Sequence, residues 1–182
     1  MKTRRLGKTG LMVSEIGFGG EWLERHPEEE GIELIHYASS KGVNILDCWM
    51  ADPKSRDIIG KGIKENRSNW FIQGHIGSTW KDEQYFRTRD MKYVRPAFED
   101  LLKRLQTDYI DLGMIHYVDS EEEWEQIQHS DYLDYVMELK NSGVIRHIGI
   151  SSHNPKVAIK AAESGYVEMI LFSINPAFDM LP

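Results

Sequence analysis

Short apolar runs rich in β-branched and aromatic residues alternate with longer segments of helical periodicity along almost the whole chain. Clusters of Gly, Pro, Asn and Asp separate the runs from the helical segments. The apolar runs predict six strands, over residues 16–20, 43–47, 70–76, 109–116, 145–151 and 169–174. The segments between them predict helices over about residues 27–40, 52–64, 91–105, 132–141 and 154–164.

Strands that alternate with helices require a parallel sheet with right-handed crossovers, either a closed barrel or an open doubly wound sheet. Three consecutive strand ends carry Asp47, His75 and His116. This favours the barrel, because an open sheet places its ligand at one switch point. The predicted fold class is therefore α/β, a (β/α)8 TIM-barrel type truncated to about six βα units, in one domain over residues 1–182.

A closed barrel of this type needs ~250 residues, and the chain has 182. We therefore expect strands seven and eight to be missing through truncation, which leaves two open sheet edges through which copies of the chain could form a homo-oligomer. Residues 2–14, with Gly7 and Gly10 around a turn, predict an N-terminal β-hairpin that covers the bottom of the barrel. Residues 77–90 predict a long loop in which Trp80, Tyr85 and Phe86 form a lid.

Composition narrows the class of protein. The chain is 41% hydrophobic and 28% charged, as expected of a soluble domain. Its net charge of −7 argues against nucleic acid as a partner, and no apolar run is long enough to span a membrane. The basic first residues are not followed by the apolar stretch of a signal peptide, which predicts a cytoplasmic location. Cys48 is the single cysteine, so no intrachain disulfide is expected.

The residues at the strand ends are of types that bind metal ions. One carboxylate and two imidazoles, from Asp47, His75 and His116, make up a two-His-one-carboxylate ligand set, with Asp52 as a fourth ligand or base. A metal-dependent barrel enzyme is therefore one alternative. A barrel without catalytic activity, acting as a binding or assembly module, is another.

Four segments carry a resemblance to a known family. They are Arg5-Leu-Gly-Lys-Thr-Gly-Leu-Met-Val-Ser-Glu-Ile-Gly-Phe-Gly-Gly20, Gly42-Val-Asn-Ile-Leu-Asp47, Leu105-Gln-Thr-Asp-Tyr-Ile-Asp-Leu-Gly-Met-Ile-His116 and Val144-Ile-Arg-His-Ile-Gly-Ile-Ser-Ser152. In order and spacing they resemble the aldo/keto reductases over nearly the whole chain. The resemblance implies a (β/α) barrel that passes hydride from NADPH to a carbonyl through an Asp, Tyr, Lys and His tetrad. The implied function is thus an NAD(P)H-dependent oxidoreductase that acts on a small aldehyde or ketone.

The tetrad is altered in this chain. Asp47 and His116 match the family's aspartate and histidine, but Asp52 stands where the family has its proton-donating tyrosine. His75 stands where the family has its lysine. Asp47, Asp52, His75 and His116 are therefore the catalytic candidates. An exposed Asp is ionised at neutral pH and cannot donate a proton, whereas His75 or His116 could act as an imidazolium donor.

The cofactor positions implied by the resemblance are also mixed. Ser151 matches the serine that contacts the nicotinamide amide, but Ser152 replaces the family's asparagine and Leu171 its glutamine. The loop with Gly19 and Gly20 lets the backbone approach a cofactor. Gly19, Gly20, Ser151 and Ser152 are thus the candidate NADP(H) contacts. The phosphate-binding loop of the family follows strands seven and eight, so weak NADPH binding is expected of these residues.

Residues 172–182 resemble a bacterial and archaeal branch of the reductases in which a ferredoxin-like segment follows the barrel. That branch carries cysteines for a [4Fe-4S] cluster in the segment. A cluster is expected only if the chain extends beyond Pro182.

Overall fold

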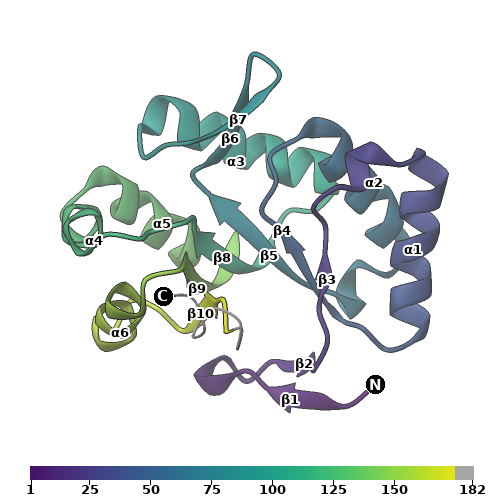
Figure 1. Ribbon diagram of the computed structural model, residues 1–182, viewed down its shortest axis with the longest axis horizontal. Helices are drawn as coiled ribbons and strands as arrows, with labels where there is room; N and C mark the ends of the chain where they lie inside the picture. Colours follow the sequence, from purple (N-terminus) through teal and green to yellow (C-terminus); the bar gives the residue numbers. More distant parts are fainter. Residues whose placement is uncertain (175–182) are drawn as a thin grey trace, which may run out of the picture.

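A computed structural model describes residues 1–174, and its centre is one six-stranded parallel sheet (Figure 1). The strand order is β10-β9-β8-β5-β4-β3. All six predicted strands are confirmed: β3 (Phe18–Gly19), β4 (Ile45–Cys48), β5 (Phe71–Ile76), β8 (Ile110–Ile115), β9 (Ile145–Ser152) and β10 (Met169–Phe172). Each strand lies beside the strand that precedes it in the parallel sheet, as βα units require.

The α-helices follow the strands, and all but the first, which starts after Pro27, begin at polar caps. The α-helices are α1 (Glu28–Ser40), α2 (Pro53–Ile63), α3 (Met91–Leu105), α4 (Glu121–Gln128), α5 (Asp131–Asn141) and α6 (Pro155–Glu163). Three short 3-10 helices are η1 (Gly7–Thr9), η2 (Leu23–Arg25) and η3 (Lys64–Asn69). Side chains of Asp52, Asp90, Ser120, Ser130 and Asn154 accept hydrogen bonds from the first turns of α2 to α6. Of these helices, α4 was not predicted with bounds.

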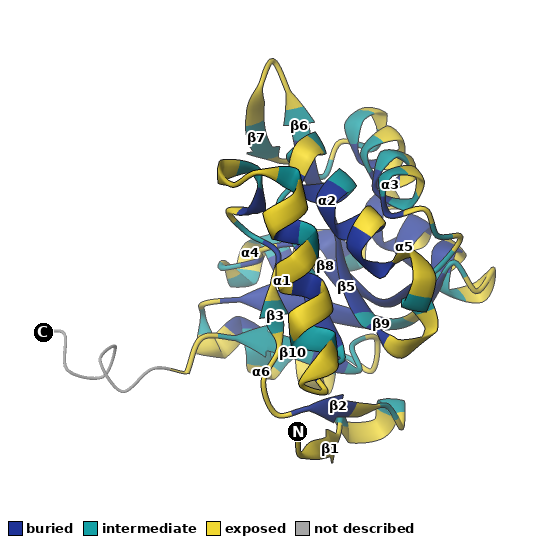
Figure 2. Ribbon diagram, turned by 90° about the vertical axis from the view of Figure 1, so that its right-hand side faces the viewer, coloured by how far each residue is buried: buried dark blue, intermediate teal, exposed yellow. Residues whose placement is uncertain are grey.

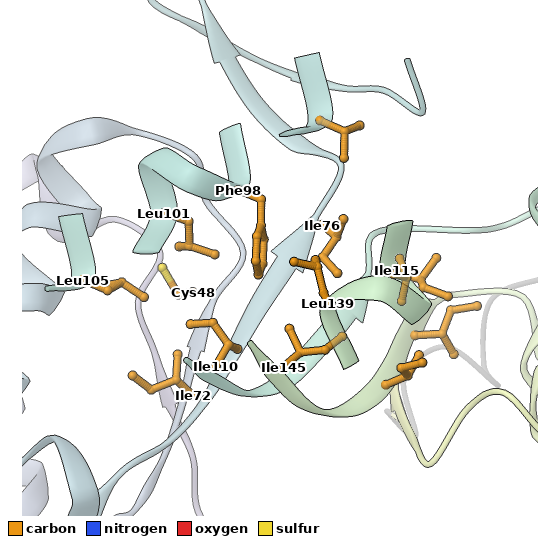
Figure 3. Close-up of a cluster of buried hydrophobic side chains, with 14 of the residues drawn as sticks. Cys48, Ile72, Ile76, Phe98, Leu101, Leu105, Ile110, Ile115, Leu139 and Ile145 are labelled. Atoms are coloured by element: carbon orange, nitrogen blue, oxygen red, sulfur yellow. The ribbon is translucent and has the colours of Figure 1, made fainter. Parts of the chain in front are cut away.

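The large hydrophobic core lies between the sheet and the helices. Figure 3 shows Ile72 and Ile76 of β5 facing Phe98 and Leu101 of α3. Helices expose their outer faces and bury their inner ones (Figure 2). Because helix side chains join this cluster and none joins the cluster on the other face, the sheet has the one-sided covering of a barrel wall.

The second apolar cluster fills the inner face of the sheet near the start of its strands. Leu112 and Met114 of β8 pack there with Val13 of the N-terminal hairpin, which consists of β1 (Thr3–Arg5) and β2 (Met12–Ser14). Ser14 and Asn44, just before β4, exchange two hydrogen bonds that fix the hairpin across this end. The predicted hairpin at the barrel bottom and the predicted fold class are confirmed (Figure 1).

Residues 77–90 are not a structureless loop, so that prediction was wrong. They contain an antiparallel hairpin of β6 (Ser78–Lys81) and β7 (Gln84–Arg87), which projects from the end of the molecule opposite β1 and β2 (Figure 1). Asp82 and Glu83 form its two-residue turn with φ of 52° and 60°. Positive φ at both central positions gives the twist that a two-residue hairpin needs.

Within the six-stranded sheet of residues 1–174, the end strands β3 and β10 each have a neighbour on one side only. None of the helices in this part of the chain is long and apolar enough to cross a membrane. The segment expected to resemble the ferredoxin-containing branch lies largely in residues 175–182, outside the described residues.

Candidate active site

A cavity of about 590 Å³ opens at the carboxyl ends of the central strands. Its volume lies in the range of small-molecule sites. Its walls come from the strands β4, β5, β9 and β10, the β7 strand of the second hairpin, and the loops after β3, β4, β8 and β9. The lining residues are Glu21, Asp47, Trp49, His75, Tyr85, Arg87, His116, Tyr117, Ser151, His153 and Leu171.

Four of these side chains form one continuous chain of hydrogen bonds. Asp47 Oδ1 lies 2.9 Å from His75 Nε2. The Nδ1 atoms of His75 and His116 are 2.8 Å apart, and His116 Nε2 is 2.7 Å from the Tyr85 hydroxyl. The structure therefore brings together three of the four predicted catalytic candidates and adds a residue that was not among them.

Strand alternation explains why Asp47 of β4 and His75 of β5 face the cavity. Successive side chains of a strand point to opposite faces of the sheet. Leu46 and Cys48 of β4 and Ile76 of β5 join the core beneath the helices, so Asp47 and His75 between or beside them point inward. His116 follows β8 directly, and its N–H donates to the Ile76 carbonyl, which holds it next to His75.

The His116 imidazole is buried, and its surroundings disfavour the protonated form. It is 4% exposed and stacks with the Trp49 ring at a centroid distance of 5.9 Å. Burial, and after it the neighbouring His75, Arg89 and Arg87 side chains, hold the pKa of His116 well below its usual range. His116 is therefore neutral at pH 7, which argues against it as an imidazolium donor.

The two-His-one-carboxylate alternative requires three ligand atoms around one point. Here both nitrogens of His75 are already engaged, one with Asp47 and the other with His116. The three side chains follow one another in a line, and among residues 1–174 no group of three His, Cys, Asp or Glu side chains is arranged to hold a metal ion. The geometry thus favours proton transfer over metal ligation for this set.

Tyr85 is the site residue that sequence reasoning missed, because it was interpreted as part of a lid. The register of the β6–β7 hairpin places Tyr85 opposite Trp80, and its ring meets Trp49 edge-on at 5.3 Å. The next residue, Phe86, points the other way onto Tyr93 of α3. The strand Gln84–Arg87 places two aromatic residues side by side and does not alternate apolar with polar residues, so its periodicity gave no signal.

Asp52 is not brought into the cavity. It is the N-cap of α2, where its carboxylate accepts from the Ser55 N–H at 2.9 Å. The glycines after β3 also have a packing role. The Gly20 N–H donates to the Asp47 carbonyl, and a Cβ on Gly20 would lie 2.7 Å from Ile59. Neither Gly20 nor the exposed Gly19 lines the cavity.

The two predicted serines differ in direction. Ser151 lines the cavity beside Leu171, and its hydroxyl oxygen accepts from the Tyr117 N–H at 2.8 Å. Its own proton is then free to be donated to an amide oxygen. Ser152 points away and donates to Asp119. Ser151 therefore fits a contact with the nicotinamide end of a dinucleotide. Ser152 does not fit such a contact.

Charged side chains around the cavity mouth are mostly paired. Arg87 contacts the Tyr117 carbonyl and Glu123, and Arg89 donates to the His116 carbonyl. These arginines therefore fasten the second hairpin to the loop after β8. Cys48 is buried on the helix side, and burial raises the pKa of its thiol to about 12, as expected of an inert thiol.

The fold and this cavity define a protein of the (β/α) barrel type with a small-molecule site at the carboxyl ends of its strands. Comparison with known proteins gives the family. Residues 15–180 match the model of the aldo/keto reductase family. The chain belongs to the aldo/keto reductase family.

Relatives and solved structures agree with this assignment. The chain is 32% identical to aldo-keto reductase YhdN of Bacillus subtilis, over 99% of this chain and 54% of that protein. It is 29% identical to the uncharacterized oxidoreductase YqkF of the same organism, over 100% of this chain and 58% of that protein. The holo form of aldo-keto reductase AKR11C1 from Bacillus halodurans superposes with a TM-score of 0.80 at 30% identity, covering 96% of this chain and 58% of that one.

The chain thus spans just over half the length of these relatives. One more distant neighbour, an aldo-keto reductase from Klebsiella pneumoniae, was solved in complex with NADPH. It shares the fold, with a TM-score of 0.69 at 21% identity over 89% of this chain and 53% of that one. The expected iron–sulfur segment stays a prediction.

Proposed function

We propose that the protein to which these residues belong reduces a small aldehyde or ketone with NAD(P)H. The observation that carries the proposal is the hydrogen-bonded line of Asp47, His75 and His116 in a cavity at the carboxyl ends of the strands. Barrel enzymes keep their chemistry at this face. Membership of the aldo/keto reductase family supports the same reaction class.

The cavity residues divide the work between binding and proton handling. When bound, NAD(P)H supplies a hydride to the carbonyl carbon. Ser151 would hold the nicotinamide amide, with Leu171 against the ring. The carbonyl oxygen, where negative charge develops during reduction, would then lie at the end of the hydrogen-bonded chain farthest from Asp47. Asp47 orients His75 by accepting from its Nε2–H, which leaves Nδ1 for His116.

The test measures NADPH affinity through the quenching of tryptophan fluorescence, to which Trp49 in the cavity contributes. Ser151→Ala removes one donor to the nicotinamide amide and should raise the dissociation constant by about 2- to 10-fold, the effect of one neutral hydrogen bond. Ser142→Ala is the matched control, because the Ser142 hydroxyl caps the end of α5 by donating to the Leu139 carbonyl. An equal change in both variants would contradict the proposed placement of the nicotinamide.

Turnover is measured on the natural full-length protein, as carbonyl-dependent loss of NADPH absorbance over a panel of small aldehydes and ketones. The proposal predicts stoichiometric oxidation of NADPH with at least one class of carbonyl. NADPH binding without oxidation by any member of the panel would overturn it.

A further inference from the structure

We propose that Tyr85, carried into the cavity by the β6–β7 hairpin, is the group that protonates the carbonyl oxygen. His116, His75 and Asp47 are then the relay that restores its proton. This inference rests on the proposed function, and it assigns the acid that the altered tetrad lacks. Tyr85 lies outside all four family positions, on a segment that was expected to be a loop.

The position of the Tyr85 hydroxyl carries the inference. It lies 2.7 Å from His116 Nε2, at the free end of the hydrogen-bonded chain, and Tyr85 lines the same cavity as Ser151. A proton donor has to be within hydrogen-bond reach of both its substrate and its proton source. Tyr85 is within hydrogen-bond reach of His116 as its proton source, and it lines the cavity in which a carbonyl substrate would lie.

The hairpin is built to hold this hydroxyl in place. At its base the Ser78 hydroxyl donates to the Trp49 carbonyl at 2.5 Å, and the Thr88 N–H donates to the Gly77 carbonyl. At its other side Arg89 donates to the His116 carbonyl at 2.5 Å. The contacts join the hairpin to the loops after β4 and β8, which hold the rest of the site. A surface lid would not need to be fixed to the site residues.

The other candidate donors are less suitable. His116 is neutral because burial disfavours its charged form, and both of its nitrogens are engaged. Asp52 caps a helix outside the cavity. Tyr117 also lines the cavity. Among residues 1–174, however, its hydroxyl makes no hydrogen bond to His116, His75 or Asp47. Tyr85 alone combines a neutral O–H with a connection to the relay.

The charges around Tyr85 suit a phenol that loses and regains a proton. Burial raises the pKa of the Tyr85 phenol, so the hydroxyl is protonated at neutral pH. The guanidinium groups of Arg87 and Arg89 act in the opposite direction and favour the phenolate. They therefore stabilise the phenolate that forms when Tyr85 transfers its proton.

The proton can be followed along the relay. With one proton more on the His75–Asp47 pair, His75 Nδ1–H donates to His116 Nδ1, and His116 Nε2–H donates to the Tyr85 oxygen. The phenolic O–H is then free to face the substrate. As the carbonyl carbon accepts a hydride with its electron pair, the π electrons of the C=O bond move to oxygen, and the oxygen takes the Tyr85 proton.

Each donor of the relay then passes one proton on. Tyr85 takes the proton of His116 Nε2, and His116 Nδ1 takes the proton of His75 Nδ1. His75 is left neutral, with its Nε2–H on Asp47. The substrate has gained one hydride and one proton and has become an alcohol. The relay has lost one proton. When the alcohol leaves and water enters the cavity, the protons move back to His116 Nε2 and His75 Nδ1, and Tyr85 takes its proton from that water, which restores the starting state.

The test is Tyr85→Phe, which removes the hydroxyl and keeps the ring against Trp49. In the full-length holoenzyme, kcat for carbonyl reduction should fall about 10²- to 10⁴-fold, the usual contribution of a general acid. The dissociation constant for NADPH should change less than 3-fold. Tyr93→Phe is the matched control, since Tyr93 packs on the far face of the hairpin against Phe86; it should leave kcat unchanged.

A second readout does not depend on turnover. Nitrogen-15 NMR of labelled histidines should show the His116 Nε2 resonance shifting in Tyr85→Phe and staying in place in Tyr93→Phe. An unchanged His116 resonance in Tyr85→Phe overturns the contact on which the inference depends. If the wild-type protein reduces carbonyls and Tyr85→Phe does so within 3-fold, the inference fails and the proposed function stands. If the wild-type protein reduces no carbonyl, the proposed function fails and takes the inference with it.

Discussion

The buried His116 makes the stability of this protein depend on pH in a way that can be calculated. Its imidazole is 4% exposed and hydrogen-bonded to His75 on one side and Tyr85 on the other. Burial is the largest cause that holds the pKa of His116 well below its usual range, followed by His75, Arg89 and Arg87. The folded protein therefore keeps this imidazole neutral in mildly acidic solution.

The sign of the effect follows from proton counting. In the unfolded chain a histidine takes up a proton at about pH 6.5, whereas folded His116 does not. Below that pH the unfolded state binds more protons, so the stabilisation is fully present above about pH 6.5 and is lost as the pH falls further. Between pH 7.5 and pH 5.5 the contribution of His116 to the loss is on the order of 1 kcal/mol, because the unfolded chain takes up this proton and the folded protein does not.

Urea unfolding at both pH values, followed by the fluorescence of the five tryptophans, measures this loss. The quantity to compare is the change in unfolding free energy between the two pH values. This change should be smaller by about 1 kcal/mol in His116→Asn than in the wild type. His129→Asn, at an exposed position, should keep the wild-type change. A wild-type pH dependence in His116→Asn would refute the conclusion that the fold keeps this imidazole neutral.

Three further predictions concern the parts that position the site. Asp52→Ala should destabilise the protein by about 1 kcal/mol and Asp52→Asn hardly at all, because Asn caps a helix as well as Asp does. Gly60→Ala should cost about 2 kcal/mol in urea unfolding, since its Cβ would lie 2.0 Å from the Arg104 carbonyl oxygen and the clash outweighs the gain in helix propensity. Asp111→Asn should cost about 3 kcal/mol in thermal or urea unfolding, because it breaks the buried ion pair with Arg67; a loss under 1 kcal/mol would contradict this.

The strands and most helices could be predicted because local patterns determine them. Runs of Val, Ile and Leu, and caps such as Asp52 and Asn154, carry their signal within a few residues. The β6–β7 hairpin could not be predicted, because its turn residues Asp82 and Glu83 both adopt positive φ and neither is the glycine that usually marks such a turn. The bounds of α4 could not be predicted, because Trp124 and Ile127 are its only buried apolar side chains and give too short a helical pattern.

The site was predictable where it depends on strand position and not where it depends on tertiary placement. Asp47, His75 and His116 stand at strand ends, so barrel geometry brings them together. Ser151 and Ser152 were predicted to act together, but neighbouring strand residues point to opposite faces, and only Ser151 lines the cavity. Tyr85 reaches His116 across 31 residues of sequence, through a hairpin that no local pattern indicated.

The most direct test of the central claim is the fate of the transferred hydrogen. The natural full-length protein is given NADPH in which both hydrogens at C4 of the nicotinamide are deuterium, together with a small carbonyl that it consumes. Mass spectrometry of the product then locates the label. We expect an alcohol with one deuterium on the former carbonyl carbon. An alcohol without deuterium, or loss of the carbonyl without formation of an alcohol, would contradict it.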